Sequence, residues 1–148
     1  MAPPVEFSLD DVLPHRPPMR LVDSARRAGP SAIESEWASP PGFRWSDGHV
    51  VHRVALLEFA AQTAAAWSGL SRLDRGLAPV PGYLGGVDGF TFEGDAAPGE
   101  TLRCRMDVRF RMGDTVRVAC AVSGANGRIL ARGEMSLALA LDAPAERV

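Results

Sequence analysis

The chain has 148 residues, of which 46% are hydrophobic and 23% are charged, and its formal net charge at pH 7 is −2. These values are typical of an ordinary globular protein, so we expect a single domain over residues 1–148. A net charge this small gives no general reason to expect binding to nucleic acid or to a membrane. The N-terminus lacks a basic segment followed by an apolar run, which argues against a signal peptide and favours the cytoplasm.

The first third of the chain is predicted to contain one helical turn and two strands. Residues 8–13 form the turn, with Ser8 as its N-cap, and the prolines that follow end it. Residues 19–25 and 32–37 are predicted strands. Residues 39–48 are rich in Pro, Gly and Ser and are expected to form a loop.

Residues 50–75 are apolar on nearly every side and are predicted to form one long helix. The stretch contains no proline, and its alanine and leucine residues favour a helix. Gly76 and Pro79 are the expected signals for its end. A helix that is apolar all round should be buried, and Glu58 and Gln62 make it too polar for a membrane span. One sheet of this length covers only part of such a helix, so we expect a second subunit to cover the rest.

The second half of the chain is predicted to form an antiparallel sheet. Residues 83–93 are rich in glycine but extended. Residues 101–112 alternate between apolar and polar side chains, so every apolar side chain as far as Met112 is predicted to share one buried face. The last strand is predicted over residues 129–141, and the polar tail at residues 142–148 is expected to be frayed.

Two hairpin turns set the register of the last three strands. The Asn-Gly pair at residues 126–127 is a strong hairpin signal and pairs Ala125 with Arg128. A three-residue loop over residues 112–114 keeps apolar residues opposite one another, whereas a two-residue loop would place them opposite arginines. The expected pairs are Val122–Ala131, Cys120–Gly133, Val118–Met135, Arg111–Thr115, Phe110–Val116 and Met106–Cys120.

The two cysteines, Cys104 and Cys120, are predicted to be reduced thiols in the core. In this register they are diagonal neighbours at roughly 7–8 Å, too far apart for an unstrained disulfide. Their spacing does not match a metal site.

Polar residues within and just before the long helix are candidate acid–base groups. Glu58 and Gln62 are four residues apart and therefore project from one helical face. A carboxylate within a buried helix is costly unless it is bonded or used in chemistry. With His49 and His52 just before the helix, it makes a candidate acid–base pair. Glu58 can equally be a structural carboxylate bonded to backbone or to an arginine, and His49 a loop histidine.

Four segments together resemble the 3-hydroxyacyl-acyl carrier protein dehydratases. They are residues 13–23 (LPHRPPMRLVD), residues 48–49 (GH), residues 58–62 (EFAAQ) and residues 98–102 (PGETL), the last preceded by Phe90. Their order and spacing cover nearly the whole chain, and the set is far more specific than any one motif. The loop between His49 and the helix is shorter than in most of that family. In this respect the chain is more similar to a branch of dehydratases found with aryl polyene and other polyketide-like pathways.

The resemblance implies an α+β hot-dog fold, in which a curved antiparallel sheet wraps around one long central helix. It also implies dehydration of a 3-hydroxyacyl thioester to a 2-enoyl thioester, in fatty-acid or polyketide-like biosynthesis, without a cofactor or a metal. His49 would be the base and Glu58 the acid, supplied by opposite subunits of a homodimer or a dimer of dimers. His52 is the alternative base.

Other residues have supporting roles in this interpretation. Gln62 is expected to position Glu58 or a loop backbone. Val54 and Ala55 lie at the helix start, where backbone N–H groups could polarise the substrate carbonyl. His15, in a proline-rich turn, is expected to be structural.

An acyl carrier protein is the implied partner, and carrier proteins are acidic. The arginine row in residues 101–112 could steer a carrier, or it could be a solvated sheet face with cross-strand partners. Arg72 and Arg75, at the end of the helix, are equally good candidates for a carrier contact. Two other functions stay open: a hot-dog thioesterase in which Glu58 activates water, and a non-catalytic acyl-binding or structural subunit.

Overall fold

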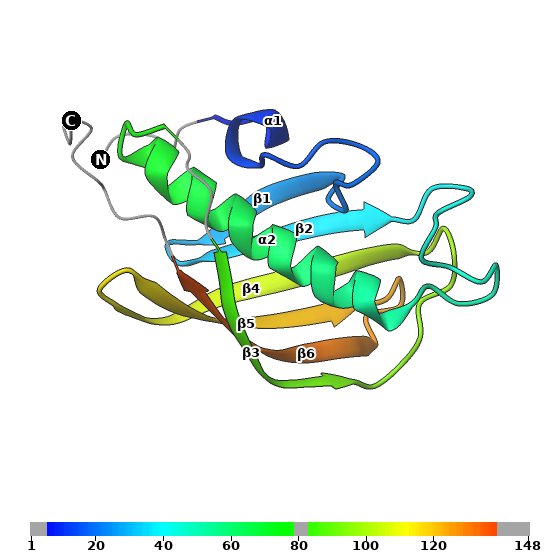
Figure 1. The fold of residues 1–148 in the computed structure, drawn as a ribbon. Helices are drawn as coiled ribbons and strands as arrows, with labels where there is room; N and C mark the ends of the chain where they lie inside the picture. The colour runs from blue at the N-terminus through cyan, green and yellow to red at the C-terminus, as the bar shows by residue number, and fades with distance from the viewer. Residues whose placement is uncertain (1–5, 79–82, 139–148) are drawn as a thin grey trace.

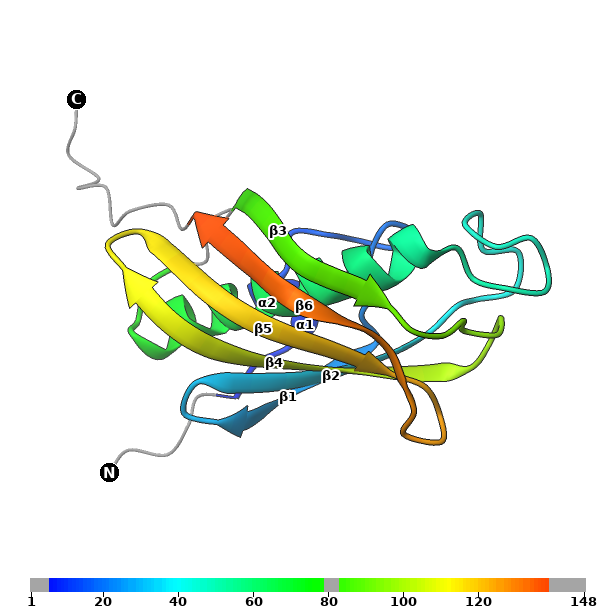
Figure 2. The ribbon, with the colours of Figure 1, turned by 90° about the horizontal axis from the view of Figure 1, so that it is seen from below.

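The computed structural model describes residues 6–78 and 83–138, which form one antiparallel sheet with a long helix lying across one face (Figure 1). The elements are α1 (Leu9–Val12), β1 (Ser24–Gly29), β2 (Ala32–Ala38), α2 (Arg53–Asp74), β3 (Tyr83–Phe92), β4 (Thr101–Met112), β5 (Thr115–Ser123) and β6 (Ile129–Ala138). The strand order is β1-β2-β4-β5-β6-β3, so β1 and β3 are the edge strands. Figure 2 shows the sheet from its other side, with α2 behind it. A curved antiparallel sheet around one helix is the α+β fold that the sequence predicts.

The core fills the space between α2 and the sheet. Leu56 and Phe59 contribute to it from the helix, and Ile33, Met106 and Met135 contribute from the strands, all fully buried. Burying a side chain of this size contributes about 1.5–3 kcal/mol. This packing fixes the orientation of α2, and with it the direction of every polar side chain on the helix.

α1 packs directly on α2 at a glycine. A Cβ atom at Gly69 would lie only 2.3 Å from the backbone oxygen of Val12, so only glycine allows this close approach. Ser8 is the N-cap of α1, as predicted, and its N–H donates to the Asp11 carboxylate at 3.0 Å. The N-terminal segment is therefore fixed against the helix.

α2 ends at a glycine, as predicted. Gly76 has a φ of +73°, and the Leu77 N–H donates to the Arg72 carbonyl at 2.9 Å, which satisfies the last turn. Pro79, the other predicted signal, lies outside the described residues. The helix starts at Arg53 rather than at residue 50, because the two valines before it belong to the preceding loop. Within the described chain, no helix is long and apolar enough to cross a membrane.

The residues before β1 are not the strand that the sequence predicts over 19–25, because β1 begins only at Ser24. The backbone there bonds to a side chain of α2 instead. The Leu21 N–H donates to Gln62 Oε1 at 2.7 Å, and Gln62 Nε2 donates to the Met19 carbonyl at 2.9 Å. A side-chain amide therefore replaces a neighbouring strand as the hydrogen-bond partner.

The predicted register between β5 and β6 is confirmed. The observed pairs include Val122–Ala131, Cys120–Gly133 and Val118–Met135. The predicted Ala125–Arg128 pair is wrong, because the Gly124 N–H donates to the Arg128 carbonyl at 2.9 Å. Within the turn, Asn126 Oδ1 accepts the backbone N–H of Arg128 at 3.1 Å. The predicted extension of the last strand to residue 141 and the tail lie outside the described residues.

The predicted register between β4 and β5 is correct as far as Val108 and wrong beyond it. Met106 faces Cys120, as expected. A β-bulge between Val108 and Phe110 then leaves Arg109 as an extra residue on β4. Every later side chain of the strand therefore projects from the opposite face.

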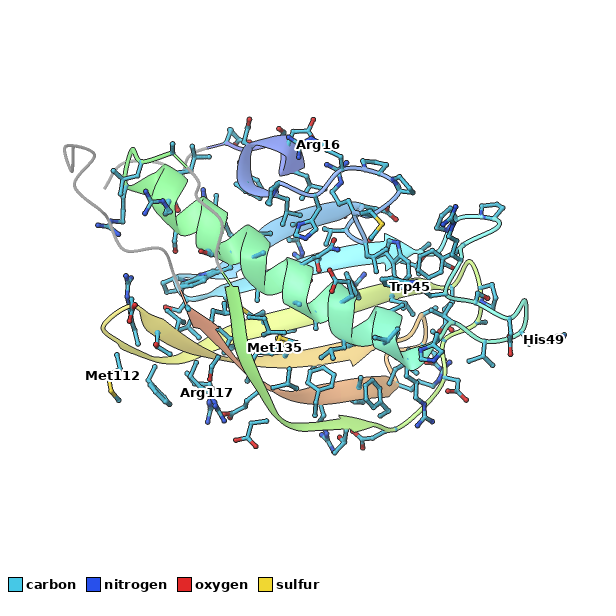
Figure 3. All side chains as sticks on the ribbon, in the orientation of Figure 1. Arg16, Trp45, His49, Met112, Arg117 and Met135 are labelled. Atoms are coloured by element: carbon cyan, nitrogen blue, oxygen red, sulfur yellow. The ribbon has the colours of Figure 1, made fainter. Side chains whose placement is uncertain are left out.

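The bulge moves the last two apolar residues of β4 out of the core. Phe110 is 53% exposed and Met112 is 72% exposed. Figure 3 shows Met112 on the side of the sheet away from α2. Met112 pairs with Thr115, so the turn contains two residues and not three. The wrongly predicted pairs are Arg111–Thr115 and Phe110–Val116.

Candidate active site

Glu58 lies on α2, half buried, beside the fully buried Gln62. Gln62 Nε2 donates to Glu58 Oε1 at 2.9 Å, so the predicted contact between the two is present. The Gln62 amide also bonds the backbone of Met19 and Leu21, and these partners fix which end is oxygen and which is nitrogen. One oxygen of the Glu58 carboxylate is therefore held by a buried and fully bonded amide.

Glu58 belongs to a stripe of α2 that is not fully covered. Leu57, Ala61 and Ala65 are half buried, and Val54 is 45% exposed. Their spacing of three and four residues places them on one side of the helix. A single chain therefore leaves this apolar side, with its carboxylate, accessible to a partner or a substrate.

His49 lies in a tight turn before α2, and its side chain is exposed. The Asp47 carboxylate accepts the N–H of Val50 at 2.8 Å and the N–H of His49 at 2.7 Å. These two bonds hold the pKa of Asp47 below its ordinary value. Gly48 has a φ of +92°, which favours glycine. Figure 3 shows His49 at the outer end of this turn, beyond the start of α2.

The loop that carries this turn is anchored on both sides. Before it, the Phe43 ring packs edge-on against the buried Trp37, with ring centroids 5.1 Å apart. After it, the buried Val51 donates its N–H to the Ala96 carbonyl at 2.9 Å. The turn at residues 47–50 therefore projects from a fixed base.

His52 is the N-cap of α2. Its Nδ1 accepts the Val54 N–H at 3.1 Å, and its carbonyl accepts the Ala55 N–H at 2.9 Å. Nδ1 therefore carries no proton in this arrangement, and in the neutral ring Nε2 carries it. The N–H groups of Val54 and Ala55, which the sequence offers to a substrate carbonyl, already have partners within the chain.

A cavity of about 620 Å³ lies between this loop and the start of α2. It is lined by residues 44–47 and 50–54. Neither His49 nor Glu58 lines it, and no hydrogen bond or ion pair joins the two within the described residues. Within the described residues, one chain therefore shows no contact between the predicted base and the predicted acid.

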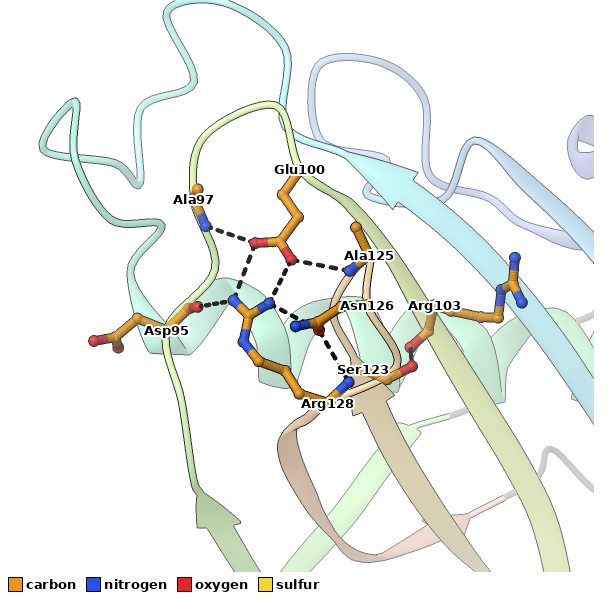
Figure 4. Close-up of polar contacts among 8 residues, drawn as sticks. All are labelled: Asp95, Ala97, Glu100, Arg103, Ser123, Ala125, Asn126 and Arg128. Carbon is orange, nitrogen blue, oxygen red and sulfur yellow. Dashed lines mark hydrogen bonds and ion pairs between the residues drawn. The ribbon is translucent and has the colours of Figure 1, made fainter.

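An ion pair that the sequence did not predict lies next to Ala96, whose carbonyl accepts the Val51 N–H. Arg128 Nη1 lies 3.1 Å from Glu100 Oε2, and the Glu100 side chain is only 10% exposed (Figure 4). Partial burial raises the pKa of Glu100. The N–H groups of Ala97 and Ala125, together with Arg128, lower it by more, so it lies below its ordinary value. Both residues occur in turn motifs, but only the fold brings the two turns together.

The arginines in the first half of β4 have cross-strand partners. Arg103 bonds Glu36 at 2.8 Å, and Arg105 bonds Glu34 at 3.3 Å and Asp107 on its own strand at 3.0 Å. This matches the interpretation of a solvated sheet face. It gives these two arginines a structural partner without any carrier protein.

The remaining titratable candidates show no catalytic arrangement. Cys104 and Cys120 are free buried thiols, and their mutual hydrogen bond and burial raise the pKa of Cys120. The thiol therefore stays protonated and is a poor nucleophile. The Nδ1 atom of His15 is buried and has no hydrogen-bond partner within the described chain. No group of three or more His, Cys, Asp or Glu among the same residues could hold a metal ion.

The fold, with a carboxylate on its one long helix, defines a hot-dog protein. The dehydratase heterocomplex ApeI:P from Xenorhabdus doucetiae is similar, with a TM-score of 0.80 and 21% identity over 93% of this chain and 94% of that chain. The PaaI protein from the phenylacetic acid degradation operon of E. coli has a TM-score of 0.62 and 13% identity over 77% of this chain and 80% of that chain. These likenesses show the fold.

The family model described as ApeP-like, ApeP dehydratase, matches residues 7–144. A relative from Anaeromyxobacter sp. strain K, named 3-hydroxyacyl-acyl-carrier-protein dehydratase FabZ, is 30% identical over 141 residues, covering 89% of this chain and 88% of the relative. A relative of the same name from Bordetella parapertussis is 30% identical over 138 residues, covering 84% of each chain. The chain therefore belongs to the ApeP-like family of hot-dog dehydratases, as the resemblance predicts.

Proposed function

We propose that this protein dehydrates a 3-hydroxyacyl thioester to the 2-enoyl thioester in fatty-acid or polyketide-like biosynthesis. Membership of a dehydratase family supports the reaction, and the observation that carries it is the Glu58 carboxylate held by Gln62 on a partly exposed side of α2. In the elimination, a base removes a proton from C2 and an acid protonates the hydroxyl that leaves C3 as water.

His49 is the base and Glu58 the acid in this proposal, and Gln62 positions Glu58. His52 is the weaker candidate for the base, because its Nδ1 lone pair accepts the Val54 N–H and its Nε2 then carries the proton. His49 has an exposed ring with no such bond within the described chain.

The start of α2 supports the developing negative charge. The positive end of the helix dipole lies at Val54 and Ala55, where it would stabilise enolate character on the substrate carbonyl. The exposed side chain of Val54 lies at the rim of the cavity and offers an apolar contact to the acyl group.

The complete site forms between two subunits, so that His49 of one subunit meets Glu58 of the partner subunit. The half-exposed stripe of α2 around Glu58 supports this, as does the edge strand β3, on which Leu84 and Val87 are 45% and 42% exposed. Such an edge has unpaired backbone groups that can join a second sheet. We expect a homodimer or a dimer of dimers, with an acyl carrier protein or coenzyme A bearing the substrate. The two free thiols favour a reducing cytoplasm.

Mass spectrometry of a 3-hydroxyacyl carrier protein incubated with the purified protein tests the reaction. Loss of water from the carrier supports dehydration. Loss of the acyl group would identify a thioesterase, and binding without turnover would identify a non-catalytic subunit.

Glu58→Gln tests the acid. The new amide oxygen still accepts the Gln62 N–H, but the side chain no longer donates a proton as an acid. Turnover is expected to fall by about 10²–10⁴-fold. The melting temperature should stay close to that of the wild type, which separates this outcome from unfolding.

Mixing two inactive variants tests the shared site. His49→Ala and Glu58→Gln subunits, unfolded together and refolded as a mixture, should recover about a quarter of wild-type activity, because half of the dimers then contain one intact site. No recovery from a mixture that light scattering shows to be dimeric would place both groups in one subunit.

A further inference from the structure

We propose that Glu100 and Arg128 are positioning residues, which fix the loop that carries His49 by clamping the backbone on both sides of Ala96. The catalytic consequence rests on the proposed function. The structural consequence, that the clamp holds this loop, does not depend on it.

The clamp bonds Asp95 and Ala97, which precede and follow Ala96 in the sequence (Figure 4). The carbonyl of Asp95, just before it, accepts a hydrogen bond from Arg128 Nη2 at 3.0 Å. The N–H of Ala97, just after it, donates to Glu100 Oε1 at 3.0 Å. Because the peptide groups on either side are fixed, the direction of the Ala96 carbonyl is fixed as well.

The two charged side chains are themselves tightly held. Arg128 donates from Nη1 to Glu100 Oε2 at 3.1 Å and from Nη2 to Glu100 Oε1 at 3.3 Å, which is a two-point contact. Glu100 Oε2 also accepts the Ala125 N–H at 2.9 Å, and Arg128 Nη1 donates to Asn126 Oδ1 at 3.0 Å. A Cβ atom at Gly124 would lie 2.5 Å from Glu100 Oε2 and 2.9 Å from Arg128 Nη1, so a larger residue there would displace the ion pair.

Ala96 connects the clamp to the loop that carries His49. Its carbonyl accepts the N–H of Val51, and both residues are 1% exposed. Val51 follows His49 by two residues and is the last residue before the N-cap His52. A displacement of about 1 Å in a reacting group can lower a rate by about 10²-fold. A loosened Ala96 would therefore misplace His49 without any contact between the clamp and the substrate.

Two variants test the clamp, and a third serves as the matched control. Glu100→Gln places an NH₂ group where one carboxylate oxygen now accepts two donors. Arg128→Lys removes the planar fork that reaches Glu100, Asn126 and Asp95 together. Glu36→Gln breaks the exposed Arg103–Glu36 pair, which has the same two residue types and a shorter N–O distance of 2.8 Å but no contact with the backbone around Ala96.

Hydrogen exchange resolved at the Val51 and His52 amides is measured together with steady-state kinetics. In Glu100→Gln and in Arg128→Lys we expect exchange at these amides to rise by about tenfold or more, with no matching rise in the centre of α2. We expect kcat to fall by about 10–100-fold and KM to change by less than about twofold. Glu36→Gln should leave both readouts unchanged. If Glu100→Gln does not fold, Arg128→Lys carries the test.

Unchanged exchange at Val51 in both folded clamp variants would overturn the inference, whatever the activity. If exchange at Val51 rises in the clamp variants while their kcat equals that of an active wild type, the positioning role is overturned as well. If the wild type shows no dehydration, the proposed function fails separately, and the exchange data alone decide whether Glu100 and Arg128 hold the loop.

Discussion

The two halves of the candidate site are held by different kinds of structure. Glu58 lies on a packed helix, and its partner Gln62 is buried and bonded to backbone more than 40 residues away. His49 lies in an exposed turn, held by Asp47 two residues away and by the bond from Val51 to Ala96. The helix half of the site, Glu58 with Gln62, is thus anchored in the packed core. Substitutions in the loop half, the turn that carries His49, should have little effect on stability.

Within the loop half, the largest effect on turnover should come from His49→Ala. The imidazole is exposed, so its removal loses little packing, and the free energy of unfolding should barely change. If His49 is the base, turnover should fall by about 10²–10⁴-fold. Steady-state kinetics and thermal melting of the same preparation check both parts.

His52→Ala is the matched control for this variant. It removes an N-cap, which typically costs about 0.5–2 kcal/mol, but it should keep most of the activity. If His52→Ala abolishes dehydration while His49→Ala does not, the assignment of the base is reversed.

Gln62→Leu should have the largest effect on stability and would show how far the helix half depends on the core. The change leaves the Leu21 N–H and the Met19 carbonyl without their partner. Of these two residues Leu21 is buried, and a buried group left unpaired costs about 1–3 kcal/mol, so the free energy of unfolding should fall by about 1–3 kcal/mol in urea titrations. A loss below about 1 kcal/mol would contradict a structural role for the amide.

Asp47→Ala should have a smaller effect, confined to the loop half. The pKa of Asp47 is lowered from its ordinary 3.8, so its stabilising contribution is complete above that pH and is lost as pH falls through the lowered value. At neutral pH the carboxylate is charged, and its removal frees the N–H groups of His49 and Val50. We expect faster exchange at both amides and a drop in kcat of less than about tenfold. Asp47→Asn, which keeps an acceptor oxygen, should lie between Asp47→Ala and the wild type.

Asp95→Asn should have almost no effect. The Asp95 side chain bonds Arg53 at 3.3 Å, and both side chains are about half exposed. Exposed pairs of this kind contribute about 0–1 kcal/mol. The backbone carbonyl of Asp95, which Arg128 holds, is unchanged in this variant. A large loss of activity would show that the surface pair, and not the backbone around Ala96, anchors the loop.

Local patterns predicted the helix half of the site better than the loop half. The spacing of Glu58 and Gln62 places them on one face of any helix, so their contact followed from sequence alone. The other partners of Gln62 are 41 and 43 residues away, and no local pattern identifies them. For the same reason the strand predicted over residues 19–25 is wrong before Ser24, because the backbone of Met19 and Leu21 bonds to this amide.

Alternation predicts which residues share a face only while the strand stays regular. The β5–β6 register was correct because no bulge occurs between Val118 and Val122. In β4 the alternation of residue types continues through Arg109, but the bulge there exchanges the two faces. The sequence pattern is the same with or without the bulge, so Phe110 and Met112 were wrongly placed in the core. The Glu100–Arg128 pair was missed because it joins two turns that only the finished sheet brings together.

The position of β3 in the sheet has a consequence for the order in which the protein assembles. β3 follows α2 in the sequence, yet it pairs with β6, the last strand among the described residues, and the Thr91 hydroxyl contacts the carbonyl of Arg132, 41 positions later. A chain still emerging from the ribosome therefore has β3 before its partner exists. Closing so long a loop is slow, and an unpaired strand can join the wrong chain. We expect the sheet to be completed only after β6 has been made, so that a second subunit meets the completed β3 edge as the last step of folding.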